Sequence, residues 1–241
     1  MTIFEAEKDT FTASDWLAYF KENAHQRQSI PWKLGIAVEP HLRGPLIRSL
    51  QRFQVGEQGD GIHLRKAAAM THDLAYIGAI VLFVKEEQEH SRLLARLIEG
   101  MGGDLLRHHW SDTCFVGLRR LLGLRLELLV LLVAEIIAQA YYKILHDGSN
   151  DVVLRSVCAQ ILHDEHGHVA FHCAYLRQVF ASYAPLTRWL IYKSWSIFYM
   201  LVCLIVIYDH RSVFRAVGVT PRACWRDCMR AFHTAHIFTH E

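Results

Sequence analysis

His163-Asp164-Glu165-His166-Gly167-His168 is the stretch that decides the fold. Within it, Glu165 and His168 are three residues apart, so in a helix both side chains project from one face. A carboxylate and an imidazole that share a helix face are suited to binding a metal ion. The spacing therefore predicts a helix that presents metal ligands to a neighbouring element.

The same unit occurs earlier in the chain, where Glu87 and His90 form the pair. Two further acids, Glu57 and Glu135, are separated by the same offset as the two pairs, so each lies equally far ahead of its own Glu-x-x-His. A matched acid also precedes each pair directly. This internal repetition is hard to obtain by chance, and it indicates two related helix pairs that face each other.

Glu135 lies inside an otherwise uncharged apolar run, Leu128 to Ala138. A carboxylate with apolar neighbours on every face of a helix is not solvated. Because burying an uncompensated charge is very costly, the Glu135 carboxylate must be paired, protonated or bound to a metal ion.

The complete pattern, Glu then Glu-x-x-His, repeated once, resembles the site of the ferritin-like di-iron carboxylate superfamily, in which four bundle helices carry these ligands inward. The resemblance covers residues 46–183. The predicted metal ligands are Glu57, Glu87, His90, Glu135, Glu165 and His168. Oxygen ligands with some nitrogen and no sulfur favour iron(II) or manganese(II). We expect two iron ions, with a manganese–iron pair or two manganese ions as alternatives, and dioxygen as co-substrate.

One metal ion is expected at Glu57, Glu87 and His90, and the other at Glu135, Glu165 and His168. The resemblance implies that Glu87 and Glu165 bridge the two ions. Ligating histidines usually donate their second ring N–H to a carboxylate or carbonyl.

The acid ahead of each pair suits that role. The resemblance implies that Asp164 bonds His90 and that Glu86 bonds His168. A zinc site made of His163, His166, His168 and His172 is the alternative metal hypothesis. It leaves the glutamates of the repeat unexplained.

Two residues break the symmetry of the repeat. His172 corresponds to Leu94, and Tyr142 corresponds to Leu64. Both lie about two turns from a predicted ligand, roughly 10 Å along a helix axis. We expect them either to line a substrate or oxygen pocket or to be hydrogen-bonded core residues.

No segment shows sustained strand alternation, so the sequence predicts an all-α fold: a ferritin-like four-helix bundle with an N-terminal arm and two extra C-terminal helices. Helices are expected over residues 46–69, 73–99, 113–146 and 151–183, with a crossover at 104–112. Three glycines, Gly56, Gly59 and Gly61, lie within the first of these helices and indicate a bend, a bulge or close packing.

A single domain over residues 1–241 is expected, with an arm at 1–42, a di-metal bundle at 43–183 and helices at 184–241. The arm carries a short helix over 15–24, which Thr12 or Ser14 caps. After the bundle, Pro185 opens a helix that runs to about Arg215.

Its uncharged run, residues 194–208, is shorter than the ~20 residues that cross a bilayer. It predicts a buried helix and no transmembrane span, with peripheral membrane contact as the alternative.

The net charge, the cysteine pattern and the N-terminal residues bear on the possible partners and the location of the protein. A formal net charge of +2 gives no basis for expecting binding to nucleic acid or to an anionic membrane. Six cysteines without a CxxC pair favour a reducing compartment. Residues 1–10 have no apolar signal region, so we expect a cytoplasmic protein.

By resemblance, the leading hypothesis is an oxygen-activating di-iron oxidase or monooxygenase that acts on an apolar small organic substrate. An external electron donor of the ferredoxin or reductase type would supply electrons to the metal ions. A homodimer is compatible with the sequence. One alternative is a ferroxidase or peroxidase that handles iron or peroxide. A second is a non-catalytic helical module whose metals hold the fold.

Overall fold

The computed structural model describes residues 11–106, 117 and 123–235. These residues contain no strand, which confirms the all-α prediction. Most of the predicted crossover and the predicted start of the third helix lie outside the described residues. The helices are α2 (Ala13–His25), η1 (Trp32–Leu34), α3 (Pro40–Glu57), α4 (Ile62–Ala69), α5 (Leu74–Gly100), α7 (Leu124–Asp147), α8 (Val152–Phe180), α9 (Pro185–Asp209), α10 (Arg211–Ala216) and α11 (Pro221–Thr234).

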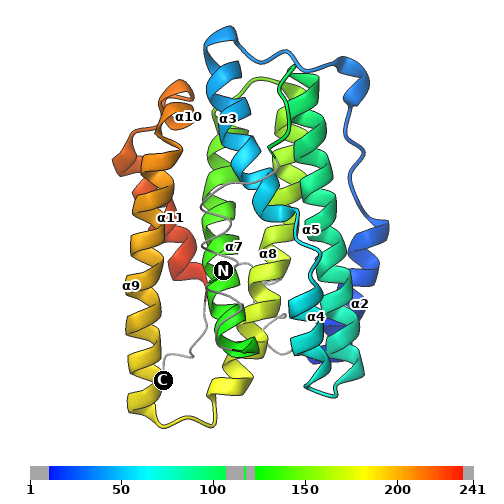
Figure 1. The fold of residues 1–241 in the computed structure, drawn as a ribbon, viewed down its shortest axis with the longest axis vertical. Coiled ribbons are helices and arrows are strands. Elements are labelled where there is room, and N and C mark those ends of the chain that lie inside the picture. Colours follow the sequence, from blue (N-terminus) through cyan, green and yellow to red (C-terminus); the bar gives the residue numbers. More distant parts are fainter. Residues whose placement is uncertain (1–10, 107–116, 118–122, 236–241) are drawn as a thin grey trace.

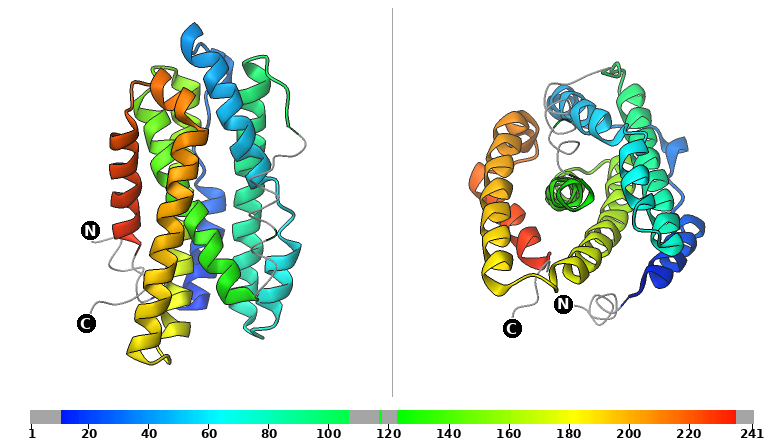
Figure 2. Two further views of the ribbon diagram at one scale, coloured as in Figure 1. Left: turned by 60° about the vertical axis from the view of Figure 1, so that its left-hand side comes forward. Right: turned by 60° about the horizontal axis from the view of Figure 1, so that its bottom comes forward.

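Helix α7 lies at the centre of the molecule, with the other long helices arranged around it (Figure 2, right). It packs along α8 and also contacts α4, α9 and α11. Because other helices cover α7 on every side, its sequence is apolar all round. The apolar run that surrounds Glu135 is thus explained by a fully enclosed helix.

The other long helices form two sides around α7 (Figure 1). On one side α3 and α4 follow each other along α5, and α2 packs against the outer side of α5. On the other side α9 and α11 pack against each other and against α7. The described part of the N-terminal arm, residues 11–42, is therefore part of the packed structure. Thr12 caps its helix through a reciprocal bond with Asp15.

The predicted helix over residues 46–69 is wrong as one continuous element. Helix α3 begins at Pro40, because proline is favoured at the first helical position. It includes Pro45 and ends at Glu57. A break follows, and Gly61 adopts φ 62°, which is costly for residues with a side chain.

Gly61 also has a packing role. A Cβ atom on Gly61 would lie 2.6 Å from the Cγ atoms of Val84 on α5. The break therefore lets the chain pass close to α5 directly after Glu57.

The prediction of a buried helix over residues 194–208 is also wrong. Among the described residues, two helices are long and apolar enough to cross a membrane, by length and composition: Leu124–Asp147 and Pro185–Asp209. The most apolar window of the first is 89% buried inside the protein, but that of the second is only 22% buried. Hydropathy alone does not separate an enclosed helix from one at the edge, and α9 lies at the edge (Figure 1). The predicted run to about Arg215 is interrupted at His210, and α10 begins at Arg211.

Candidate metal centre

The structure gathers the six predicted ligands in one cluster between α3, α5, α7 and α8. Ligand atoms of Glu57, Glu87 and His90 lie within 4.8 Å of one another, which could hold a metal ion. Ligand atoms of Glu87, Glu135, Glu165 and His168 form a second group by the same measure. Glu87 belongs to both groups, which is the position of a bridging carboxylate. Glu165 belongs only to the second group, although its Oε1 lies 3.6 Å from the Nδ1 of His90.

The two histidines turn the same ring nitrogen toward the carboxylates. The Nδ1 of His168 lies 3.1 Å from Glu87 Oε1 and 3.4 Å from Glu135 Oε2. The Nδ1 of His90 lies 3.5 Å from Glu87 Oε1. Both side chains are fully buried. Nδ1 is therefore the atom that each ring offers to a cation.

The other ring nitrogen of each histidine is held from behind by an acid of the opposite helix. His90 Nε2 lies 3.0 Å from Asp164 Oδ2, and His168 Nε2 lies 2.9 Å from Glu86 Oε2. Both contacts are the ones that the family resemblance implied. A proton fixed on Nε2 leaves the lone pair on Nδ1 free to bind a metal ion.

Three polar side chains that the sequence reasoning missed support these acids. The amide of Asn23 on α2 donates to Glu86 Oε1 at 2.7 Å and to Asp164 Oδ1 at 2.9 Å. Arg27 and Gln160 also donate to Asp164, at 2.8 Å and 3.0 Å. A signal was present in the sequence, because Asn23 follows Trp16 and Phe20 on the buried face of α2. A polar residue on an apolar helix face indicates a buried partner.

The electrostatics of the cluster are compatible with a site that could hold cations. Burial and the neighbouring carboxylates raise the pKa of Glu57 and of Glu165 well above the ordinary value. Burial also opposes ionisation of Glu87, but the adjacent rings of His168 and His90 hold its pKa well below the ordinary range. Without a cation, the cluster must retain protons to relieve repulsion between its acids.

Buried polar atoms that lack hydrogen bonds indicate whether these residues suit a metal ion. Glu87 Oε1, Glu135 Oε1, Glu165 Oε2, His90 Nδ1 and His168 Nδ1 are buried and make no hydrogen bond of normal geometry among the described residues, although Glu87 Oε1 and His168 Nδ1 lie 3.1 Å apart. Such groups are rare in folded proteins unless an ion or water satisfies them. Four carboxylates and two neutral imidazoles also match the charge of two divalent ions. The donor set fits iron or manganese.

The two residues that break the repeat both lie at the cluster. The hydroxyl of Tyr142 donates to Glu57 Oε1 at 3.5 Å. His172 is fully buried beside Phe83 and Phe171, and burial lowers its pKa to about 4. Neither ring nitrogen of His172 has a hydrogen-bond partner among the described residues, so a hydrogen-bonded core histidine does not describe it.

The alternative zinc set does not assemble. His163 and His166 are exposed on α8, whereas His168 and His172 point into the core. The four rings therefore lie on different faces of one helix, and one ion cannot bind all of them.

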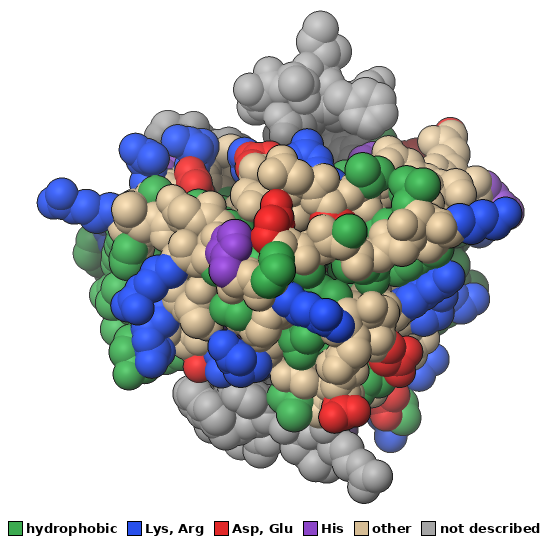
Figure 3. All heavy atoms as spheres, turned by 90° about the horizontal axis from the view of Figure 1, so that it is seen from above, with side chains coloured by type: hydrophobic (Ala, Val, Ile, Leu, Met, Phe, Trp, Pro, Cys, Tyr) green, Lys and Arg blue, Asp and Glu red, His purple; other side chains and the backbone are tan. Residues whose placement is uncertain are grey.

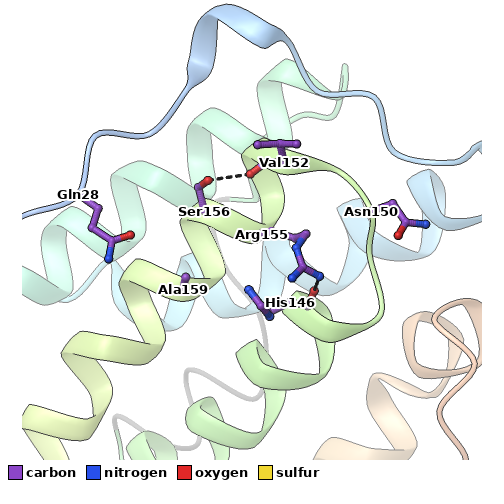
Figure 4. Close-up of a pocket in the computed structure, with 7 residues that line it drawn as sticks. All are labelled: Gln28, His146, Asn150, Val152, Arg155, Ser156 and Ala159. Atoms are coloured by element: carbon purple, nitrogen blue, oxygen red, sulfur yellow. Dashed lines mark hydrogen bonds between the residues drawn. The ribbon is translucent and has the colours of Figure 1, made fainter.

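An open surface pocket of about 370 Å³ lies apart from the cluster, where α7 ends and α8 begins (Figure 4). Its polar groups are engaged locally, since Arg155 donates to the His146 carbonyl and Ser156 donates to the Val152 carbonyl. Tyr142 and His172 do not line this pocket.

Comparisons of the chain with family models, with curated proteins and with solved structures gave no match. The functional interpretation therefore depends on the cluster itself.

Proposed function

We propose that this chain is a ferritin-like di-metal carboxylate protein, and that it works as an oxygen-dependent oxidase or monooxygenase on an apolar organic substrate. The observation that carries the proposal is the pair of ligand groups that share Glu87 inside a helical core. In this proposal α3 with α4, α5, α7 and α8 are the four elements of the bundle.

The metal ions would be held by the Nδ1 atoms of His90 and His168 and by the four glutamates. Two ferrous ions held in this way would supply the electrons for reducing dioxygen. An external donor would then restore the reduced state.

The chain's own residues prepare this site. Glu86 and Asp164 keep a proton on the Nε2 of each histidine, so that both rings stay in the tautomer that binds cations. Helix α2 covers these acids and excludes water from them, because Asn23 occupies the space between them. Buried ligands held by fixed partners keep their geometry when the charge of the centre changes.

Residues beside the ligands favour an organic substrate over iron handling. His172 and Tyr142 replace the leucines of the other repeat half. The ring of His172 lies 4.8 Å from that of Phe83, and the ring of Tyr142 lies 5.5 Å from that of Phe53. A neutral buried imidazole in apolar surroundings is suited to hydrogen bonding with a bound molecule or with dioxygen. An iron-entry path would instead need charged side chains along it.

Metal loading tests the proposal. Protein loaded anaerobically with iron(II) should retain two ions per chain and consume oxygen when air is admitted. The substitution Glu87→Gln keeps the shape but removes the shared charge, and it should lower retention of both ions. Glu89→Gln is the matched control, since Glu89 is on the same helix but pairs with Arg92 at the surface. Equal retention by both variants would contradict the metal site.

The reaction class is tested separately. Oxygen consumption that accelerates with an apolar organic compound supports the oxidase. Oxidation of many iron ions per chain, with mineral formation and no response to organic compounds, would identify iron handling instead. A loaded protein that consumes no oxygen would identify a structural metal site.

A further inference from the structure

Helix α9 exposes a long apolar surface. Eight of its large side chains are between 50% and 69% exposed. These outer-face residues are Leu186, Trp189, Leu190, Ile197, Leu201, Leu204, Ile205 and Tyr208. Single exposed hydrophobic residues are ordinary, but a contiguous group on one helix marks an interaction site.

The opposite face of the same helix is already occupied. Trp195, Tyr199, Cys203 and Ile207 are buried at a spacing of four residues, and α9 packs there on α7 and α11. The Trp195 indole donates to the Leu129 carbonyl at 2.8 Å, and the Tyr199 hydroxyl donates to the Cys228 carbonyl at 2.7 Å. Helix α9 lies at the edge of the molecule (Figures 1 and 2), so the exposed outer-face residues form a second apolar surface on its solvent side.

The chemistry along α9 resembles that of a membrane interface. No charged residue occurs from Ser194 to Tyr208. Trp189 and Lys193 stand at one end of this run, and Tyr208 and Arg211 stand at the other. Aromatic and basic residues at both ends of an apolar segment are typical of contact with lipid headgroups.

The surroundings of α9 are strongly basic. Residues 184–235 contain seven Arg or Lys and only two acids, Asp209 and Asp227. Asp209 pairs with Arg52 at 2.9 Å, and Asp227 pairs with Arg230 at 2.9 Å. Figure 3 shows Lys and Arg side chains beside hydrophobic ones at the edge where α9 lies. The basic residues around the apolar surface are thus complementary to a layer of negative charge.

A second copy of the chain fits this surface less well. At 100° per residue, the outer-face residues span roughly 160° of the helix circumference, whereas one partner helix contacts a narrower stripe. A twofold pairing would also bring two basic surroundings together, which costs electrostatic free energy. A lipid layer meets the whole width of the surface and supplies negative charge.

We propose that the outer face of α9 docks the protein on an anionic membrane surface. The helix lies in the plane of the headgroups, because its other face stays packed on α7 and α11. Leu201 and Leu204 enter the acyl boundary, and the basic residues of α10 and α11 contact anionic headgroups. This inference is independent of the metal centre.

Vesicle flotation tests the proposal with the full chain. The protein should float with vesicles of phosphatidylcholine and phosphatidylglycerol, and less with phosphatidylcholine alone. Higher salt should weaken the binding. The double substitution Leu201→Ser with Leu204→Ser should lower partitioning into vesicles at least about tenfold. The reason is that the docked protein would no longer insert two leucine side chains into the acyl boundary. The matched control is Met70→Ser with Leu74→Ser, which removes two exposed apolar residues from elsewhere.

The outcomes separate the alternatives. Absence of flotation with every vesicle would overturn the proposal, and so would equal losses in both double variants. Light scattering shows whether a second copy covers the surface instead. A dimer that Leu201→Ser with Leu204→Ser converts to a monomer, without vesicle binding by the parent chain, would assign the face to self-association and overturn membrane docking. Matching thermal unfolding of the variants and the parent chain shows that the fold is retained.

Discussion

Asp164 on α8 accepts a hydrogen bond from the Nε2 of His90 on α5 at 3.0 Å, so the acid ahead of one pair holds the histidine of the other. Glu86 returns the same contact to His168 at 2.9 Å. The two helices are thus joined by reciprocal bonds behind the cluster. The tautomer and orientation of both rings depend on these acids.

Removal of Asp164 therefore has a specific consequence. We expect Asp164→Ala to lower metal affinity by about 10- to 100-fold, because His90 loses the partner that fixes its tautomer. Competition with a metallochromic chelator measures this affinity. Asp227→Ala removes a partly exposed acid that pairs with Arg230, far from the cluster, and is the control. Equal affinity of the two variants would mean that the hydrogen bond does not support the site.

Removal of the Asn23 amide should lower the stability of the fold. Asn23→Ala leaves buried oxygens of Glu86 and Asp164 without a donor, and we expect a loss of about 1–3 kcal/mol in the free energy of unfolding. Denaturant unfolding of the metal-free protein measures it. Asn150→Ala removes an exposed amide with a long contact to Glu39 and should change little. Comparable losses in both variants would show that Asn23 has no special role.

The ligand cluster could be predicted from the sequence because it depends on local rules. Helical spacing sets which side chains share a face, and the single offset between the two repeat halves matches Glu57 with Glu135 and His90 with His168. The break after Glu57 does not disturb the cluster, since that residue ends α3 and still reaches its partners.

Other features depend on contacts that no local pattern encodes. The sequence indicates that Asn23 has a buried partner, but its partners, Glu86 and Asp164, are identified only when α2 docks on α5 and α8. The exposure of α9 follows from its place at the edge, because its apolar composition suits an enclosed helix equally well. In the same way, the break at Gly61 requires the close approach of Val84.

The pH dependence of the metal-free protein follows from its carboxyl groups. Burial and neighbouring acids raise the pKa of Glu57 and Glu165 above 4.5. Burial lowers the pKa of His168, but its carboxylate partners outweigh burial and raise it above 6.5. Above pH 6.5, where the lowered pKa of Glu87 and of His172 leaves these two groups mostly deprotonated in both states, the folded state binds more protons than the unfolded state. The free energy of unfolding therefore falls as pH rises from 6.5 through the folded pKa values.

We expect the unfolding temperature of the metal-free protein to drop as pH rises from 6.5, where an unfolded histidine loses its proton. Manganese(II), an air-stable probe, should remove most of this drop, because bound cations replace the protons. Thermal unfolding with and without a chelator measures both effects. Glu57→Gln should make the metal-free drop shallower. A metal-free unfolding temperature that rises with pH would contradict the proposed balance of charges.

The break between α3 and α4 gives a last prediction. Gly61→Ala should destabilise the protein by about 1–3 kcal/mol, because φ 62° disfavours a side chain and the new Cβ would meet Val84. Gly59→Ala is the control in the same break, since a Cβ there has no atom within 4 Å. Val84→Ala in the Gly61→Ala background should recover the stability lost through the clash with Val84. It should not recover the stability lost through the unfavourable backbone conformation. Denaturant unfolding of the parent chain, the two single variants and the double variant forms a double-mutant cycle, and an additive cycle would show that the two residues are not in contact.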